Sequence, residues 1–399
     1  MSNQNRPRFH FAPAKNWMND PNGLVYYKGK YHLFFQYSPD SELWKDISWG
    51  HATSTDLLNW EEHPIAILAD EEGLIFSGSA VVDYGNTTGF GSVENPAMVA
   101  IYTNVKDDIQ SQALAYSLDE GLTWTKYEGN PVLDLGLKDF RDPKVAWCEE
   151  FNTWIMVLAL ADLHKIAFYS SPDLKSWEKL SEFGPMAAVG GVWECPDLFA
   201  LITPEGERKW VLIVSLNPGG PLGGSGTQYF VGDFDGKKFT VDDPERTSPR
   251  WIDYGKDFYA AVTFNDAPDG RILIGWCSNW EYANSTPALP YRGEMAIPRK
   301  LSLDSSSILR STPAVEAGES SISIDFTERF TTDGGIVISR RDGELLVDRT
   351  VTSIDPGVFT APLPASLQTG TIAMEIIEDI HSIEIFIADG EVVLTFLNF

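Results

Sequence analysis

The stretch Ser54-Thr55-Asp56-Leu57-Leu58-Asn59-Trp60 is a short polar turn that is closed by an aromatic residue. The pattern returns at Ser117–Trp124 and at Ser171–Trp177, and a degenerate copy occupies Gly232–Phe239. The closing aromatic residues are 64, 53 and 62 residues apart. A turn that recurs at a nearly fixed period indicates a repeated supersecondary unit.

Two further series keep the same order and a similar period. One is a strongly apolar run in each unit, as expected of a buried strand, and the five runs are 31–35, 97–102, 154–160, 210–214 and 272–276. The other is a short polar motif before each apolar run, and the five motifs contain Asp20, Ser77, Asp142, Glu194 and Tyr259. Helical periodicity is scarce, so the pattern predicts an all-β chain.

The simplest architecture for five such units is a five-bladed β-propeller of four-stranded blades, predicted here for residues 1–303. In a propeller the first strand of each blade lines a central channel. The five polar motifs should therefore meet at one mouth of that channel. A set of unrelated β-sandwiches with coincidental spacing is the alternative.

The composition and the strand pattern of the chain change after residue 303. Residues 304–321 are rich in Ser, Glu, Thr and Ala, which predicts a linker. Residues 322–399 contain alternating strands that are split by Asp-Gly turns at Asp342-Gly343 and Asp389-Gly390. This pattern predicts a small C-terminal β-sandwich.

Composition limits the kind of partner. The net charge of -27 argues against nucleic acid or an anionic membrane and suits a neutral ligand such as a sugar. The 13 Trp, 14 Tyr and 22 Phe offer rings for stacking on a sugar, although β-rich proteins also use aromatic residues for packing. Cys148, Cys195 and Cys277 lack the spacing of a disulfide framework or metal site, and the His residues form no cluster. We expect no metal and no cofactor.

The N-terminal segment and the apolar runs bear on the location of the protein. Residues Met1–Pro7 lack the apolar core of a signal peptide, and no run is long enough to span a bilayer. The chain as given therefore reads as cytoplasmic, but a mature secreted protein would look the same. Whether it is a monomer or a homo-oligomer stays open.

The stretch Trp17–Gly23 places an acid, Asp20, at the start of an alternating strand. Asp142 and Glu194 occupy the same place in the third and fourth units. Singly, each acid could belong to a capped turn or an ion pair. Together they fit glycoside hydrolysis, in which one carboxylate attacks the anomeric carbon or activates water and another protonates the leaving oxygen. Crowding should raise the pKa of at least one acid, and Arg141 could hold Asp142 ionised or bind a substrate hydroxyl.

Four motifs resemble the signature blocks of glycoside hydrolase family 32, and they are Trp17–Gly23, Phe76–Ser79, Arg141-Asp142-Pro143 and Glu194-Cys195-Pro196. This family includes invertases, exo-inulinases and levanases. The resemblance covers roughly residues 8–303 in order and continues thinly in the tail. It implies a five-bladed propeller followed by a β-sandwich, and a retaining mechanism through a covalent fructosyl-enzyme.

The resemblance also implies roles for individual residues. Asp20 would be the nucleophile, Glu194 would protonate the leaving oxygen and then activate water, and Asp142 would stabilise the transition state. The carboxyl groups of Asp20 and Glu194 should then lie about 5–5.5 Å apart, as in retaining enzymes. The residues expected to bind the substrate are Asn19, Gln36, Trp44, Phe76, Ser77, Arg141, Tyr259 and Trp280.

The tail departs from the family pattern, because it is short and strands are expected to be missing around Ile336–Arg349. The expected activity is that of an exo-acting β-fructofuranosidase on inulin, levan or sucrose. Residues 279–284 and 291–293 resemble exo-inulinases and levanases slightly more than dedicated sucrases. The alternatives are a strict invertase, a fructosyltransferase, a related five-bladed hydrolase of arabinan or xylan, and a non-catalytic sugar-binding propeller.

Overall fold

The computed structural model describes residues 6–316, 321–326 and 329–399, with the backbone alone described at 321–326. Residues 1–5 of the N-terminal segment and residues 317–320 of the predicted linker lie outside the described residues. Strands dominate, and the three-residue 3-10 turns lie at Ala161–Leu163, Ala283–Ser285 and Ala365–Leu367.

Five antiparallel sheets follow one another between residues 16 and 313. The first sheet contains β1 (Asn16–Tyr27), β2 (Lys30–Tyr37), β3 (Ser48–Ser54) and β4 (Glu61–Ile67), with β20 (Tyr291–Arg292) parallel to β1. The second contains β5 (Leu74–Val82), β6 (Met98–Lys106), β7 (Ile109–Ser117) and β8 (Thr125–Lys126), with β9 (Leu133–Leu137) paired to β7.

The next three sheets repeat this order. The third contains β10 (Phe140–Cys148), β11 (Thr153–Leu160), β12 (Lys165–Ser171) and β13 (Glu178–Phe183). The fourth contains β14 (Val192–Ile202), β15 (Arg208–Asn217), β16 (Gly226–Phe234) and β17 (Phe239–Val241). The fifth contains β18 (Tyr259–Thr263), β19 (Arg271–Trp276), β21 (Arg299–Leu303) and β22 (Leu309–Pro313).

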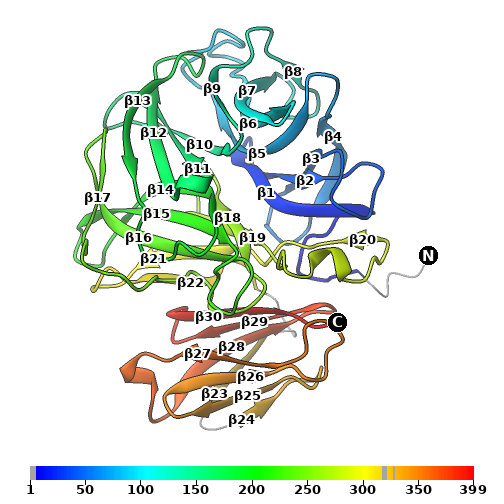
Figure 1. Ribbon diagram of the computed structural model, residues 1–399, viewed down its shortest axis with the longest axis vertical. Helices are drawn as coiled ribbons and strands as arrows, with labels where there is room; N and C mark the ends of the chain where they lie inside the picture. Colours follow the sequence, from blue (N-terminus) through cyan, green and yellow to red (C-terminus); the bar gives the residue numbers. More distant parts are fainter. Residues whose placement is uncertain (1–5, 317–320, 327–328) are drawn as a thin grey trace.

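The first strands of these sheets, which we call the inner strands, close into a ring (Figure 1). β1 contacts β5, β5 contacts β10, β10 contacts β14, β14 contacts β18, and β18 returns to β1. Side chains from the beginnings of the inner strands meet at one end of the ring, which we call the N-terminal rim. We call the opposite end the C-terminal rim. The ring confirms the predicted propeller.

A β-bulge interrupts every inner strand at its polar motif. The pairing with the second strand shifts at 18–21, 75–78, 141–144, 194–197 and 259–262. Asp142 and Cys195 have φ values of 65° and 46°, which lie in the left-handed region. A bulge turns side chains away from their regular alternation. The bulges therefore explain how acids in buried strands can face the N-terminal rim.

The recurring polar turn is a hydrogen-bonded cap between the third and fourth strands of a sheet. Asp56 Oδ1 accepts the backbone N–H groups of the second and third residues after it at 2.9 and 2.7 Å. The indole N–H of Trp60 donates to the carbonyl of Leu57 at 3.1 Å. Asp173 and Trp177 make the same bonds in the third sheet. The repeat seen in the sequence is thus a structural unit of the propeller.

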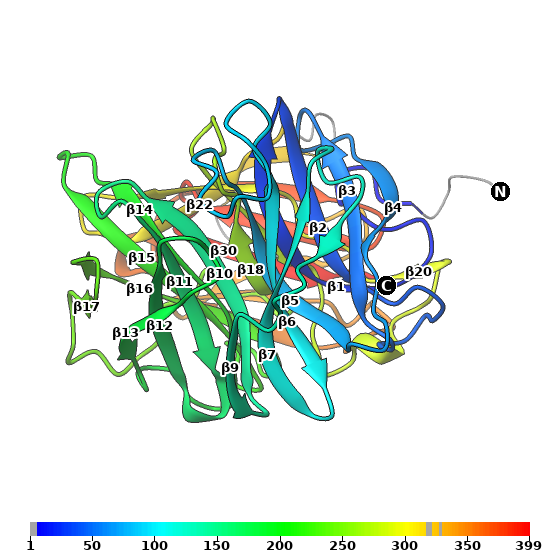
Figure 2. The same ribbon diagram turned by 90° about the horizontal axis from the view of Figure 1, so that it is seen from above.

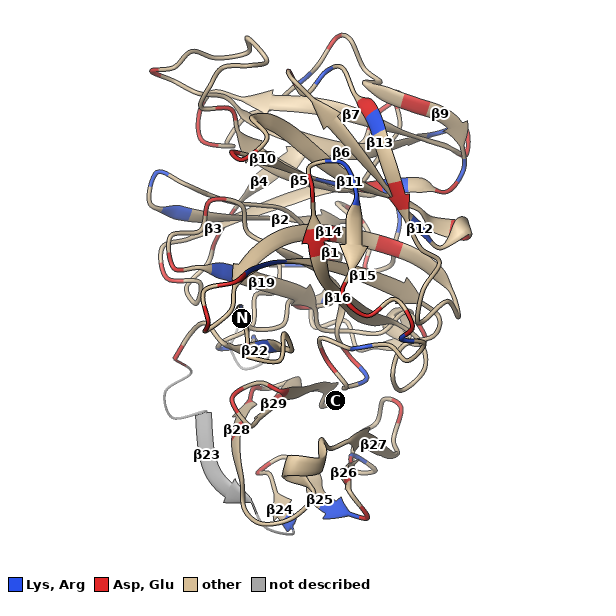
Figure 3. Cartoon of the chain, turned by 90° about the vertical axis from the view of Figure 1, so that its left-hand side faces the viewer, with Lys and Arg blue, Asp and Glu red and all other residues tan. Residues whose placement is uncertain are grey.

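The C-terminal region is a sandwich of two four-stranded antiparallel sheets. One contains β23 (Ser321–Phe326), β28 (Ile372–Glu378), β29 (Ser382–Ile387) and β30 (Val392–Leu397). The other contains β24 (Arg329–Thr331), β25 (Val337–Arg341), β26 (Glu344–Asp348) and β27 (Val358–Pro362). The predicted sandwich is confirmed. Its strands lie below the propeller in Figure 1 and Figure 3, and behind it in Figure 2.

Two details differ from the sequence-based expectations. Residues 309–313 of the predicted linker form β22, the outer strand of the fifth sheet, with Leu309 and Ser311 buried and Arg310 turned toward Asp304 at 2.7 Å. The Ser-rich composition concealed this strand because Ser311 takes an inward position usually held by an apolar residue. The region Ile336–Arg349, where strands were expected to be missing, contains β25 and β26 at the centre of their sheet.

Buried ion pairs join the sandwich to the propeller. Arg299 of β21 is fully buried, and its guanidinium donates to Asp253 at 2.9 Å and to Glu384 of β29 at 2.5 Å. Arg349, at the end of β26, is also fully buried and donates to Asp257 at 2.8 Å. Removing one partner from a buried pair leaves an uncompensated charge and costs about 3–5 kcal/mol. These contacts tie the orientation of the sandwich to the loop before β18.

Candidate active site

Asp20 lies at the bulge of β1 and is held by two neighbours. Its Oδ1 accepts a hydrogen bond from the side-chain amide of Asn19 at 2.9 Å, and its Oδ2 accepts one from the hydroxyl of Ser77 at 2.7 Å. Asn19 is itself fixed, because its Oδ1 accepts the indole N–H of Trp17 at 2.8 Å. Hydrogen bonds to a carboxylate stabilise its ionised form. Asp20 remains partly exposed and is therefore oriented but accessible.

Cys195 lies between Asp20 and Asp142. Its thiol sulfur is 3.6 Å from Asp20 Oδ2 and 3.7 Å from Asp142 Oδ2, and its backbone N–H donates to Asp142 Oδ2 at 2.9 Å. The backbone N–H of Asp142 in turn donates to the hydroxyl of Thr103 at 2.9 Å. The acids of the first and third sheets are thus connected through a residue of the fourth.

Glu194 is held from two sides. Its Oε1 accepts a hydrogen bond from Arg141 Nε at 3.0 Å, and its Oε2 accepts the phenolic O–H of Tyr259. Arg141 also binds Asp139 at 2.8 Å. The charge of Arg141 lowers the pKa of Asp142, as the sequence suggested, but its direct ion pairs are with Glu194 and Asp139. The Glu194 side chain keeps 21% of its surface exposed, so a ligand can reach it.

Burial raises the pKa of the other two acids, Asp142 and Asp20. Burial raises the pKa of Asp142 to about 7, because the charge of Arg141, which lowers it, does not compensate for desolvation and for the charge of Glu194. Burial also raises the pKa of Asp20, against the hydrogen bonds from Asn19 and Ser77 that lower it. The charge of Glu194 adds to the effect of burial on both acids, in the direction expected from crowding.

Aromatic residues and one amide surround the acids. The ring of Trp280 stacks on Trp17 with centroids 5.7 Å apart, and Trp44 packs edge-on against Phe76 at 5.6 Å. Gln36 donates to the carbonyl of the residue before Phe76 at 3.0 Å. Trp44 is 40% exposed, so its ring is available to a ligand. The structure thus brings every predicted site residue to the N-terminal rim.

Other residues at this site escaped the sequence-based prediction. Cys195 directly follows Glu194 in its motif, so its proximity to the acids could have been anticipated. Thr103 of β6 and Gln110 of β7, which accepts a hydrogen bond from Arg141 at 3.3 Å, lie on strands outside any recognisable motif. Only the fold brings them beside the acids.

Neither a metal site nor a membrane span is found in the part of the chain that the structure describes. Within 6–316, 321–326 and 329–399, no group of three or more His, Cys, Asp or Glu side chains is arranged to hold a metal ion. No helix among these residues is both long and apolar enough to cross a bilayer.

Family models match almost the whole chain. The model described as the glycosyl hydrolases family 32 N-terminal domain matches residues 10–313, and the glycosyl hydrolases family 32 C-terminal model matches residues 301–399. The chain belongs to glycosyl hydrolase family 32. The two matches correspond to the propeller and the sandwich, and the resemblance inferred from the motifs is confirmed.

Named family 32 members share much of this sequence. A levanase of Bacillus subtilis is 43% identical over 98% of this chain and 66% of its own length. An extracellular exo-inulinase of Aspergillus ficuum is 50% identical over 75% of this chain and 62% of its own. The chain thus spans slightly less than two thirds of these curated relatives. The crystal structure of exo-inulinase from Aspergillus awamori superposes with a TM-score of 0.90 at 39% identity, covering 99% of this chain and 93% of that one.

Proposed function

We propose that this family 32 protein is an exo-acting, retaining β-fructofuranosidase that releases terminal non-reducing β-D-fructosyl units from fructans and sucrose. The observation that carries the proposal is the pairing of two accessible, separately held carboxyl groups at one rim. Asp20 is oriented by Asn19 and Ser77, and Glu194 by Arg141 and Tyr259. The levanase and exo-inulinase relatives supply the substrate class.

In the first step, an ionised Asp20 oxygen attacks the anomeric carbon of the terminal fructosyl unit. The bond from that carbon to the leaving oxygen breaks, and Glu194 gives its proton to this oxygen. In the second step, Glu194 takes a proton from water, and the resulting hydroxide attacks the same carbon. The bond to Asp20 breaks, fructose leaves, and both carboxyl groups return to their starting states.

Asp142 has a supporting role in this proposal. One of its oxygens is fixed by the backbone N–H of Cys195, so its other oxygen can contact fructose hydroxyls. Arg141 orients Glu194 by donating a hydrogen bond to its Oε1. The rings of Trp44, Phe76 and Trp280 offer apolar faces for the carbon side of the sugar.

Product chromatography from sucrose, inulin and levan, assayed side by side, tests the proposal. We expect fructose as the first and main product from all three, with the fructans favoured. Release of only short oligosaccharides would contradict exo action, and arabinose from arabinan without any fructose would indicate a pentosidase. Binding without turnover would indicate a sugar-binding propeller.

A fructosyltransferase is the second candidate, because it would use every residue named above. The two activities differ in whether water or another sugar attacks the fructosyl-enzyme. The partly exposed Asp20 and Glu194 leave room for water, which favours hydrolysis. The ratio of fructose to newly formed oligosaccharide at high sucrose concentration distinguishes them.

A further inference from the structure

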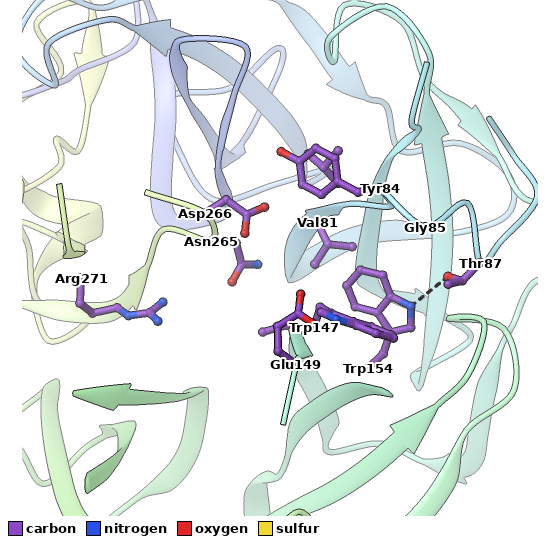
Figure 4. Close-up of a pocket in the computed structure, with 12 residues that line it drawn as sticks. Val81, Tyr84, Gly85, Thr87, Trp147, Glu149, Trp154, Asn265, Asp266 and Arg271 are labelled. Atoms are coloured by element: carbon purple, nitrogen blue, oxygen red, sulfur yellow. Dashed lines mark hydrogen bonds between the residues drawn. The ribbon is translucent and has the colours of Figure 1, made fainter. Parts of the chain in front are cut away.

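A cavity lies at the C-terminal rim, away from the acids. It has a volume of about 490 Å³. Its walls come from the loop after β5, the end of β10, the loop after β18 and the start of β19 (Figure 4). The polar and aromatic lining residues are Tyr84, Trp147, Glu149, Asn265, Asp266 and Arg271.

This cavity is separate from the candidate active site. Trp147 follows Asp142 by five residues on β10, a distance of about 15 Å along a strand. Between them, buried Lys144 pairs with buried Asp197 at 3.3 Å. The side-chain amide of buried Asn265 donates to carbonyls of β5 and β10 at 2.8 and 3.0 Å. These bonds fill the centre of the ring, so the cavity does not continue into the site at the N-terminal rim.

Several polar groups of the cavity form no hydrogen bond with the described residues, although the charge of Arg271 acts on Asp266. Among the described residues, none forms a hydrogen bond with the carboxylates of Glu149 and Asp266, the hydroxyl of Tyr84 or the indole N–H of Trp147. The neighbouring indole of Trp154 differs, because its N–H donates to a Thr hydroxyl at 2.9 Å (dashed line in Figure 4). The cavity therefore offers both acceptors and donors to a ligand.

The aromatic side chains of the cavity are positioned for a ligand with an apolar face. Trp147 packs edge-on against Trp154 with centroids 5.1 Å apart, which fixes its ring. Tyr84 is 51% exposed at the entrance. Rigid rings with a polar edge lose little conformational entropy on binding. The cavity is lined by two carboxylates and by one guanidinium, that of Arg271. The resulting negative charge disfavours an anionic ligand.

We propose that this cavity is a second, non-catalytic binding site for a unit of a neutral oligosaccharide. The sugar hydroxyls would donate to Glu149 and Asp266, and its apolar face would lie on Trp147. The site would hold a fructan chain on the face of the propeller opposite the acids. Only the choice of fructan as the oligosaccharide depends on the proposed function.

Calorimetric titration with 1-kestose tests the proposal in the Asp20→Ala variant, which should bind this sugar without cleaving it. We expect two binding events. Adding Trp147→Ala should weaken one of them about tenfold, the effect expected for removing an aromatic anchor. Adding Trp280→Ala should weaken the other event only. Turnover of sucrose by the single variant Trp147→Ala should equal that of the unmodified protein, which separates this test from the test of the proposed function.

Matched variants keep the result interpretable. Trp147→Phe should retain most of the binding because it keeps a ring, and Leu118→Ala, an exposed apolar position outside the cavity, should change nothing. If Trp147→Ala fails to fold, Tyr84→Ala and Asp266→Asn replace it in the titration. Both side chains are exposed, so these substitutions should not disturb folding. A single binding event that none of these cavity variants weakens would overturn the proposal. Binding of Ca²⁺ at the two carboxylates without any sugar binding would overturn it as well.

Discussion

At the scale of single residues, the balance between burial and hydrogen bonding at Asp20 controls the proposed chemistry. Burial raises the pKa of this carboxyl, and the bonds from Asn19 and Ser77 lower it. A nucleophilic carboxylate must be ionised, so activity should fall when the pH drops below that pKa. The two hydrogen-bond donors should therefore extend the working range of the proposed enzyme toward acid.

Ser77→Ala tests this balance. Loss of the 2.7 Å hydrogen bond removes a group that stabilises ionised Asp20, so the pKa of Asp20 should rise. The acid limb of the pH profile of kcat/KM should move to higher pH, and kcat/KM at neutral pH should fall about tenfold, as expected for about 1.4 kcal/mol of lost stabilisation. An unchanged acid limb would show that Ser77 does not tune the nucleophile. Ser79→Ala, which removes a hydroxyl bound to backbone groups of β10, is the control.

Sequence motifs revealed the acids but only part of their surroundings. Asp20, Asp142 and Glu194 could be found because each stands at the same place in a repeat. Thr103 and Gln110 could not, because they reach the site from second and third strands whose sequence carries only the signal of a buried strand. Contacts made across sheets depend on the fold and leave no local pattern.

At the scale of elements, the inner strands combine two demands in one segment. Each must pair with its neighbour and also present polar side chains at one rim. The bulges allow both, because they turn side chains toward the rim without ending the strand. At the bulges of β10 and β14, Asp142 and Cys195 have left-handed φ values. Pro143 and Pro196 directly follow these bulge positions in β10 and β14, and proline inside a sheet is typical of a bulge or an edge. The dihedral angles themselves could not be predicted from them.

The capped turn should contribute to the stability of each blade. Asp173 accepts two backbone N–H bonds at 2.9 and 2.8 Å, and its removal leaves those donors without a partner. We expect Asp173→Ala to cost about 1–2 kcal/mol and to lower Tm by a few degrees. Calorimetry at neutral pH measures this, with Asp162→Ala in a 3-10 turn as the control. An equal effect of both substitutions would contradict a specific role for the capped turn.

At the scale of the whole molecule, the sandwich helps to shape the candidate active site through Arg349. Asp257 accepts hydrogen bonds from Arg349 at 2.8 Å and from the phenol of Tyr282. Asp257 is two residues before Tyr259, and Tyr282 is two residues after Trp280. One buried arginine of the sandwich thus holds the segment before β18 and the segment after β19, which carry predicted substrate-binding residues.

Arg349→Met should therefore reduce activity as well as stability. A displacement of about 1 Å at a reacting group can cost about a hundredfold in rate, so we expect kcat to fall between about tenfold and a hundredfold. Arg310→Met is the control, because Arg310 of β22 also joins propeller and sandwich, through Glu391 at 2.7 Å, while Asp304 of the propeller binds it at 2.7 Å. If both variants lose Tm but keep kcat, the sandwich has no role in positioning the site.

His10 makes the junction between propeller and sandwich sensitive to alkaline pH. Burial lowers the pKa of His10, but its hydrogen bonds to Asp379 at 3.1 Å and Glu384 at 3.0 Å outweigh burial and raise the pKa to about 10, with Glu294 adding to the effect. A group whose pKa rises on folding stabilises the fold fully below its ordinary value of 6.5 and loses this contribution as the pH rises toward 10.

The His10→Asn variant tests whether the stabilisation by His10 is lost as the pH rises. It should lower Tm by several degrees near pH 6 and by much less near pH 10. Thermal unfolding of both proteins across this range gives the comparison. A difference in Tm that is constant with pH would contradict a charged His10 in the folded protein.

Mass spectrometry of a trapped intermediate tests the central claim most directly. In the Glu194→Gln variant, an aryl β-fructofuranoside has a leaving group that departs without protonation, whereas water lacks its base, so the fructosyl-enzyme should accumulate. We predict a mass increase of one fructosyl unit, located on the peptide that contains Asp20, and none in the variant that also carries Asp20→Asn. No adduct, or an adduct on another residue, would contradict the assignment of Asp20 as the nucleophile.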